Sequence, residues 1–165
     1  MDTQELRALQ APLKERYREE PGSGRLTLSA RGELGAGITC SVQTGRAIAE
    51  AGLHPMTGGD GTALCSGDML LEALVACAGV TLRSVATALG LAVDGTVTAE
   101  GDLDFRGTLG VDRDAPVGFE RIRLRFDLDT DATPEQRAKL VELTERYCVV
   151  LQTLRSAPAV SVAVP

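Results

Sequence analysis

The sequence predicts an α+β fold built as one domain over residues 1–165. A chain of 165 residues is long enough for one sizeable hydrophobic core. Segments with the alternating pattern of strands and segments with helical spacing succeed one another without a regular strand–helix–strand repeat. A long apolar helix separates N-terminal antiparallel strands from a C-terminal meander, which a second helix follows.

The N-terminal third is predicted to contain a helix and a hairpin. Residues 3–19 place apolar side chains at roughly helical spacing among charged ones. Residues 25–31 and 38–44 alternate apolar and polar side chains around a glycine-containing turn, which is typical of two hairpin strands. Residues 45–54 fit either a short third strand or a helical turn, and the Gly, Asp and Pro content of residues 55–67 indicates a loop.

The clearest predicted element is a helix from Ser66, a suitable N-cap, to Gly90, a suitable C-cap. It is apolar on nearly every side around residues 70–82, so we expect other parts of the protein to surround it. Glu72 interrupts its apolar run, which is too short to span a bilayer.

The C-terminal half predicts two strands, a helix and a last strand. Residues 93–107 and 118–130 alternate with a period of two. Residues 133–155 are predicted to be helical, and residues 159–165 to form the final strand. The helix should begin with a capping box and a proline at its first position, formed by Thr133, Gln136 and Pro134.

Composition and charge exclude several classes of function. The net charge of -6 disfavours a phosphate-binding surface, and no Trp, three Phe and two Tyr supply few platforms for base stacking. We therefore expect no nucleic acid among the partners. The N-terminus is charged from residue 2 and lacks the pattern of a signal peptide, so we expect a cytoplasmic protein without a membrane partner.

No segment of the sequence has the residue spacing that a metal or cofactor motif requires. Residues 127–135 begin like a calcium loop but lack the glycine and glutamate at its sixth and twelfth places. His54 is the only histidine and no G-x-S-x-G motif is present, which disfavours a serine hydrolase. Possible zinc ligands are scattered without a C-x-x-C pair: Cys40, His54, Cys65 and Cys77.

Cys77 lies near the middle of the predicted apolar helix, where two interpretations remain open. A free cysteine often packs as a small hydrophobic residue. Its helical neighbours Leu70, Ala73 and Thr81 offer no group that stabilises a thiolate, and the helix N-terminus is too distant. A reactive Cys77 would therefore need activating groups from elsewhere in the fold or from another chain.

Two cysteine-containing segments together resemble the OsmC/Ohr family (osmotically inducible protein C and organic hydroperoxide resistance). SGDMLLEALVACAGVTL, residues 66–82, resembles the family's central helix, whose pattern is roughly P-x-E-L-L-x-A-A-L-x-x-C. TERYCVVLQTL, residues 144–154, resembles its second element, close to C-P-V-S-x-x-L. VSVAVP, residues 160–165, matches its closing strand, and the resemblance is weakest before residue 60.

The resemblance implies an OsmC-like intertwined homodimer that acts as a thiol peroxidase on organic hydroperoxides. Cys77 would be the peroxidatic thiolate, which becomes a sulfenic acid. Cys148 would resolve it as a disulfide, and a dithiol reductant would restore both thiols. The chemistry implied needs no metal, flavin or haem.

The family also uses a glutamate near the helix start and an arginine of the partner chain to hold the thiolate. The aligned acid here is Asp68, preceded by Gly67 where the Ohr branch has its glutamate; Glu72 is an alternative. The arginine should come from the N-terminal strands, where Arg46 is preferred to Arg25 and Arg31.

Further departures concern the second motif and the remaining cysteines. Val149 replaces the usual proline and Leu151 the serine, which changes the expected surroundings of Cys148. Cys40 and Cys65 match no functional position of the family; we expect strand packing for Cys40 and a loop position for Cys65.

Two other functions fit these departures. A non-catalytic protein on the same fold could bind small apolar ligands in its dimer cleft. A purely structural or partner-binding dimer would neither consume peroxide nor gain stability from ligands.

Overall fold

The computed structural model describes residues 2–5, 7, 8, 10, 11, 19, 31–34, 39–43, 48–110 and 112–164, with the backbone alone at 31–34, 39–43 and 48. The chain divides into two compact units. The first contains Met1–Glu19, Ala73–Thr98 and Arg125–Pro165, and the second contains Glu20–Glu72 and Ala99–Leu124. Several of residues 3–11 are helical, as predicted, and the predicted strand 25–31 lies outside the described residues except for Arg31.

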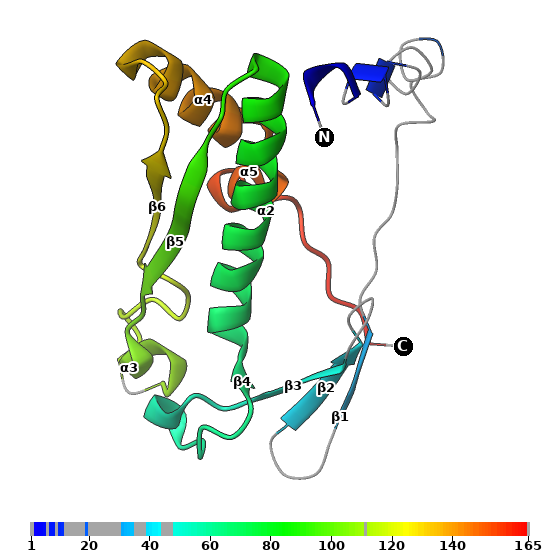
Figure 1. The fold of residues 1–165 in the computed structure, drawn as a ribbon. Helices are drawn as coiled ribbons and strands as arrows, with labels where there is room; N and C mark the ends of the chain where they lie inside the picture. The colour runs from blue at the N-terminus through cyan, green and yellow to red at the C-terminus, as the bar shows by residue number, and fades with distance from the viewer. Residues whose placement is uncertain are drawn as a thin grey trace. The chain divides into compact units, whose positions relative to one another are not determined.

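The second unit contains a four-stranded sheet in the order β1-β2-β3-β4 (Figure 1). β1 (Arg31–Leu34), β2 (Thr39–Gln43) and β3 (Ile48–Gly52) pair antiparallel in sequence, and the short β4 (Leu64–Cys65) lies parallel to β3. The register sets Cys40 opposite Leu34 and Ala51. The ambiguous segment 45–54 therefore contains a strand.

The long helix is confirmed as α2 (Ser66–Leu89), with Ser66 as its first residue rather than its cap. It ends at Gly90, whose φ of 69° is left-handed and favours glycine. The helix buries one side chain every four residues: Leu74, Ala78, Leu82 and Ala86. In the first unit Leu82 and Ala86 of this row form a core cluster with Val93 and with Leu140 of α4 (Pro134–Tyr147).

α2 is long and apolar enough to meet the criteria for a membrane span, with 28% of its most apolar window buried. One such helix is weak evidence for a membrane protein, because the core helix of a soluble protein meets the same criteria.

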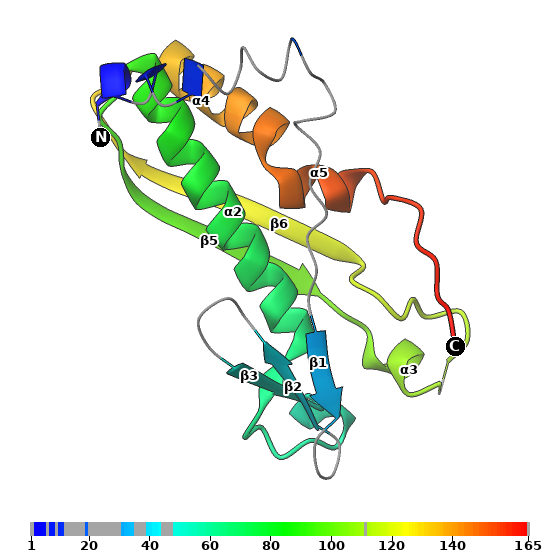
Figure 2. The same cartoon turned by 90° about the vertical axis from the view of Figure 1, so that its right-hand side faces the viewer.

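β5 (Asp94–Asp102) and β6 (Arg121–Asp129) form the predicted meander as an antiparallel two-stranded ribbon (Figures 1 and 2). Half-buried and exposed side chains alternate along β6, as its sequence pattern predicts. The predicted strand 93–107 is too long, because Asp104 caps a short helix, α3 (Phe105–Thr108), by accepting the N–H of Arg106.

The predicted helix 133–155 is in fact two helices, α4 and α5 (Val149–Arg155). Cys148, between them, has φ −73° and ψ 107°, an extended conformation that interrupts the helical hydrogen bonds. The capping box of Thr133 and Gln136 is confirmed at the start of α4.

The predicted strand 159–165 is absent over the described residues 159–164, which have no regular secondary structure. Val160, Val162 and Val164 keep the alternating pattern of a strand but are 82–92% exposed. A strand needs a neighbour to accept its backbone hydrogen bonds, and within the described residues none pairs with this segment.

Replacing the Thr133 cap should destabilise α4. The Gln136 N–H donates to the Thr133 hydroxyl at 3.3 Å, and Thr133→Ala removes that acceptor. We expect unfolding to become easier by about 1 kcal/mol, measured as the urea midpoint by circular dichroism. Thr133→Asn retains a capping oxygen and is the control; an equal loss in both variants would contradict the assignment.

A candidate thiol site

Cys77 and Cys148 are brought together in the first unit, close enough for each side chain to shift the pKa of the other. Cys77 lies on the middle of α2 and is half-buried, whereas Cys148 is 0% exposed. Both are free thiols in the structure. Two cysteines remote in the sequence therefore share one location.

The break between α4 and α5 positions Cys148. Its N–H donates to the Thr144 carbonyl at 3.0 Å and closes α4, while its carbonyl accepts the Gln152 N–H at 2.9 Å and opens α5. The first N–H groups of a helix have no partner within that helix. The amides of Val149, Val150 and Leu151 are therefore free to meet the two sulfurs.

These amides lower the pKa of Cys77. Burial acts in the opposite direction and raises it, but the backbone N–H of Val150, the Cys148 side chain and the backbone N–H of Val149 hydrogen-bond the sulfur. Together they bring the pKa of the Cys77 thiol below its ordinary value. Apart from Thr81, the groups that lower the pKa of Cys77 thus lie outside the helix that carries it.

Thr81 was not expected to help, yet its hydroxyl is also close enough to contribute to the lower pKa of Cys77. That hydroxyl donates its single hydrogen to the Cys77 carbonyl oxygen at 2.8 Å. Thr81 therefore makes the smallest contribution to the lower pKa of Cys77, and the backbone N–H of Val150 makes the largest.

Cys148 is affected in the opposite direction. Burial raises the pKa of its thiol; the Leu151 N–H opposes this, while the hydrogen bond and the charge of the Cys77 side chain raise the pKa further. Because one thiolate disfavours a second beside it, the pair favours one ionised and one protonated sulfur. Such a pair combines a nucleophile with a neutral thiol that can later attack it.

The other predicted site residues are not brought to this pair by the described contacts. Asp68 lies exposed in the first turn of α2, about two and a half turns before Cys77, and is not among the groups that interact with its sulfur. The alternative acid, Glu72, is also exposed. Arg46 and Arg25 lie outside the described residues, and Arg31 is described by its backbone alone.

Sequence reasoning missed Val149 and Val150, which act through their backbone N–H groups. One signal was available: a proline at position 149 would have no N–H, so the valine there adds a donor. The described residues contain no group of three or more His, Cys, Asp or Glu side chains that could hold a metal ion.

The fold and the paired sulfurs define an α+β protein with a two-cysteine site. Residues 59–163 match the model of the OsmC-like protein family, and the chain belongs to that family. No curated protein sequence matches the chain.

Solved structures confirm the fold. An OsmC-like protein from Mycoplasma pneumoniae is similar, with a TM-score of 0.67 and 14% identity over 80% of this chain and 89% of that one. An organic hydroperoxide resistance protein OsmC from Legionella pneumophila is similar with a TM-score of 0.58 and 19% identity, over 79% of this chain and 90% of that one. The organic hydroperoxide resistance protein OhrB of Bacillus subtilis is similar with a TM-score of 0.54 and 18% identity, over 80% of this chain and 93% of that one.

Removing the N–H of residue 149 should raise the pKa of Cys77. Val149 is 71% exposed and begins α5, so Val149→Pro suits the helix while deleting a donor to the sulfur. A raised pKa leaves less thiolate at neutral pH. The rate of Cys77 alkylation by iodoacetamide should therefore fall several-fold at pH 7, and its midpoint should move to higher pH.

Val149→Ala retains the N–H and is the matched control. A Cys77 midpoint that is the same in the proline and alanine variants would contradict the role of this amide.

Proposed function

We propose that this protein is a thiol-dependent peroxidase that reduces organic hydroperoxides, with Cys77 as the peroxidatic and Cys148 as the resolving cysteine. The observation that carries the proposal is the proximity of two free thiols that shift each other's pKa values, with that of Cys77 lowered and that of Cys148 raised. Two similar structures are titled organic hydroperoxide resistance proteins, which supports the same class of substrate.

In the first step the Cys77 thiolate attacks an oxygen of the hydroperoxide. The sulfur–oxygen bond forms, the O–O bond breaks, and the alkoxide leaves as an alcohol after gaining a proton. The Cys77 sulfur loses two electrons and becomes a sulfenic acid. The backbone N–H groups of Val149 and Val150 lower the pKa of Cys77, which increases the fraction of thiolate available for this step.

In the second step Cys148 attacks the sulfenic sulfur, a disulfide forms and water leaves. The Cys77 thiolate raises the pKa of Cys148 through its charge, and that charge disappears when Cys77 is oxidised. The resolving thiol therefore ionises more readily once it is needed. A dithiol reductant then exchanges with the disulfide and restores both thiols.

The same proposal includes a homodimer of single OsmC-like domains in the cytoplasm. Apolar side chains are exposed close to both cysteines in the sequence: Val80 is 73% exposed and Val149 is 71% exposed. The exposed valines of residues 160–164 also retain the alternating pattern of a strand, and no strand among the described residues pairs with them. In this proposal a second copy covers these surfaces and brings its Arg46 toward the Cys77 thiol of its partner, and Asp68 is the acid that pairs with this arginine.

Peroxidase activity should depend on both proposed cysteines, but in different ways. With cumene hydroperoxide and a dithiol, Cys77→Ser should lose turnover completely. In a separate assay without added dithiol, Cys148→Ser should consume about one peroxide per chain and keep Cys77 as a sulfenic acid, because no resolving thiol is present. Peroxide consumption and dimedone trapping of Cys77, read by mass spectrometry, measure the two results.

Cys65→Ser is the matched control and should retain turnover, because Cys65 is a free thiol of the second unit. Unchanged turnover in Cys77→Ser would contradict the proposed function.

The proposed dimer predicts a solution mass of twice one chain by light scattering. Val80→Asp places a charge on the exposed apolar face of α2 and should shift the mass toward one chain. Arg137→Asp changes an exposed polar position of α4 and should leave the dimer intact. A native protein with the mass of one chain would contradict the dimer.

A further inference from the structure

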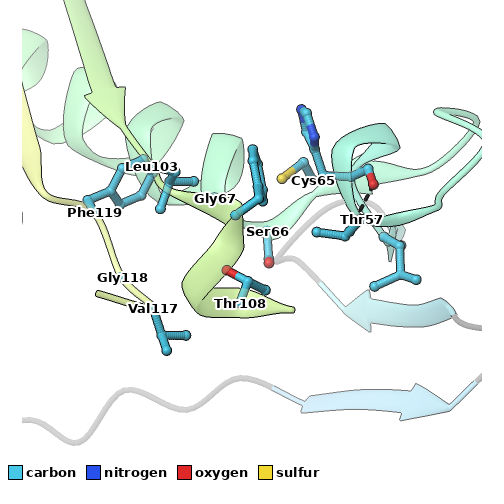
Figure 3. A pocket seen from close by; sticks show the side chains of 13 residues that line it. Thr57, Cys65, Ser66, Gly67, Leu103, Thr108, Val117, Gly118 and Phe119 are labelled. Atoms are coloured by element: carbon cyan, nitrogen blue, oxygen red, sulfur yellow. Dashed lines mark hydrogen bonds between the residues drawn. The ribbon is translucent and has the colours of Figure 1, made fainter. Parts of the chain in front are cut away.

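A pocket of about 330 Å³ lies at the start of α2, entirely within the second unit. Five apolar side chains line it: Leu53, Leu103, Phe105, Val117 and Phe119. Figure 3 shows that its labelled residues come from separate segments, with Cys65, Ser66 and Gly67 at the helix start and Val117, Gly118 and Phe119 before β6. We call this cavity the α2 pocket; its volume suits a small ligand.

Gly67 leaves this pocket open. A Cβ atom at this position would lie 3.5 Å from Phe119 Cζ, 3.6 Å from Cys65 Sγ and 3.8 Å from Leu103 Cδ1, which are ordinary contact distances. All three neighbours line the pocket, so a longer side chain at position 67 would extend into the same space.

His54 is one of the polar residues that line the pocket, together with Thr57, Ser66 and Thr108. Its Nδ1 accepts the Met56 N–H at 3.1 Å, which assigns the proton of the neutral ring to Nε2. The ring also stacks on Phe105, with centroids 5.0 Å apart and an interplanar angle of 15°. The imidazole is therefore held in place, and in the described part of the chain its Nε2–H has no hydrogen-bond partner.

The charges nearby disfavour an anionic ligand. Asp102 and Asp104, on either side of Leu103, are paired with Arg123 and Arg106. Asp68 remains exposed in the same helical turn as Gly67 and would repel a carboxylate. An uncharged hydrogen-bond acceptor on an apolar body fits the pocket better.

We propose that the α2 pocket binds a small uncharged apolar molecule with one carbonyl-type acceptor, which the Nε2–H of His54 orients. This site uses neither Cys77 nor Cys148 and does not depend on peroxidase chemistry. It is also formed by one chain, unlike a cleft between two chains. Cys65, which lines the pocket and is a free thiol, provides a built-in reporter of its occupancy.

The test measures alkylation of Cys65 in the full-length protein by mass spectrometry, with 2-nonanone as the probe. We expect the ketone to slow the Cys65 reaction about tenfold at ten times its dissociation constant, while Cys77 in the same sample is unaffected. Nonanoate, which has a similar chain but a negative charge, should protect less. Failure of the ketone to protect Cys65 overturns the proposal, and stronger protection by nonanoate overturns the uncharged class.

Variants at two positions separate binding from a general change of structure. Gly67→Leu should abolish protection by filling the pocket, whereas Gly67→Ala adds only the tolerated Cβ and should retain it. His54→Phe keeps an aromatic ring beside Phe105 but lacks the N–H, so protection should weaken several-fold. Full protection in Gly67→Leu would show that the ketone binds outside the α2 pocket. Undiminished protection in His54→Phe would show that His54 does not contact the ketone. Either result contradicts the proposal.

Discussion

The interruption of the C-terminal helix at Cys148 is the constraint on which the thiol site depends. If α4 continued through residue 148, the amides of Val149 and Val150 would donate to carbonyls of the preceding turn. The extended conformation of Cys148 leaves these two N–H groups without helical partners, and both lower the pKa of the Cys77 thiol. This extended conformation thus determines both where the buried thiol of Cys148 lies and how the half-buried thiol of Cys77 ionises.

The resulting asymmetry is what distinguishes a reactive pair from two packed thiols. The described groups that lower the pKa of Cys77 are backbone amides and neighbouring side chains without a formal charge. Backbone donors remain through most side-chain substitutions, and proline is the exception because it has no N–H. The valine at position 149 therefore strengthens the support of Cys77 from within its own chain, whatever a cation from a second chain adds.

Local signals were enough to predict α2, the strand of residues 121–129 and the capping box of Thr133, because periodicity and caps depend on nearby residues. The break at Cys148 carries no proline or glycine, so helical spacing concealed it. The prediction of a strand at residues 159–165 was wrong over the described residues 159–164, because a strand forms only where another segment, remote in the sequence, pairs with it. The cysteine pair came only from a family resemblance, and the α2 pocket, built from separate segments, had no sequence signal.

The order in which the two cysteines lose their protons tests the central claim most directly. In protein labelled with ¹³C at cysteine Cβ, the chemical shift of each thiol can be followed against pH, with residues assigned by substitution. The account predicts that Cys77 ionises below the ordinary pH of a free thiol and Cys148 above it. The account would be contradicted if Cys148 ionised at a lower pH than Cys77, or if both thiols had the ordinary pKa of a free cysteine.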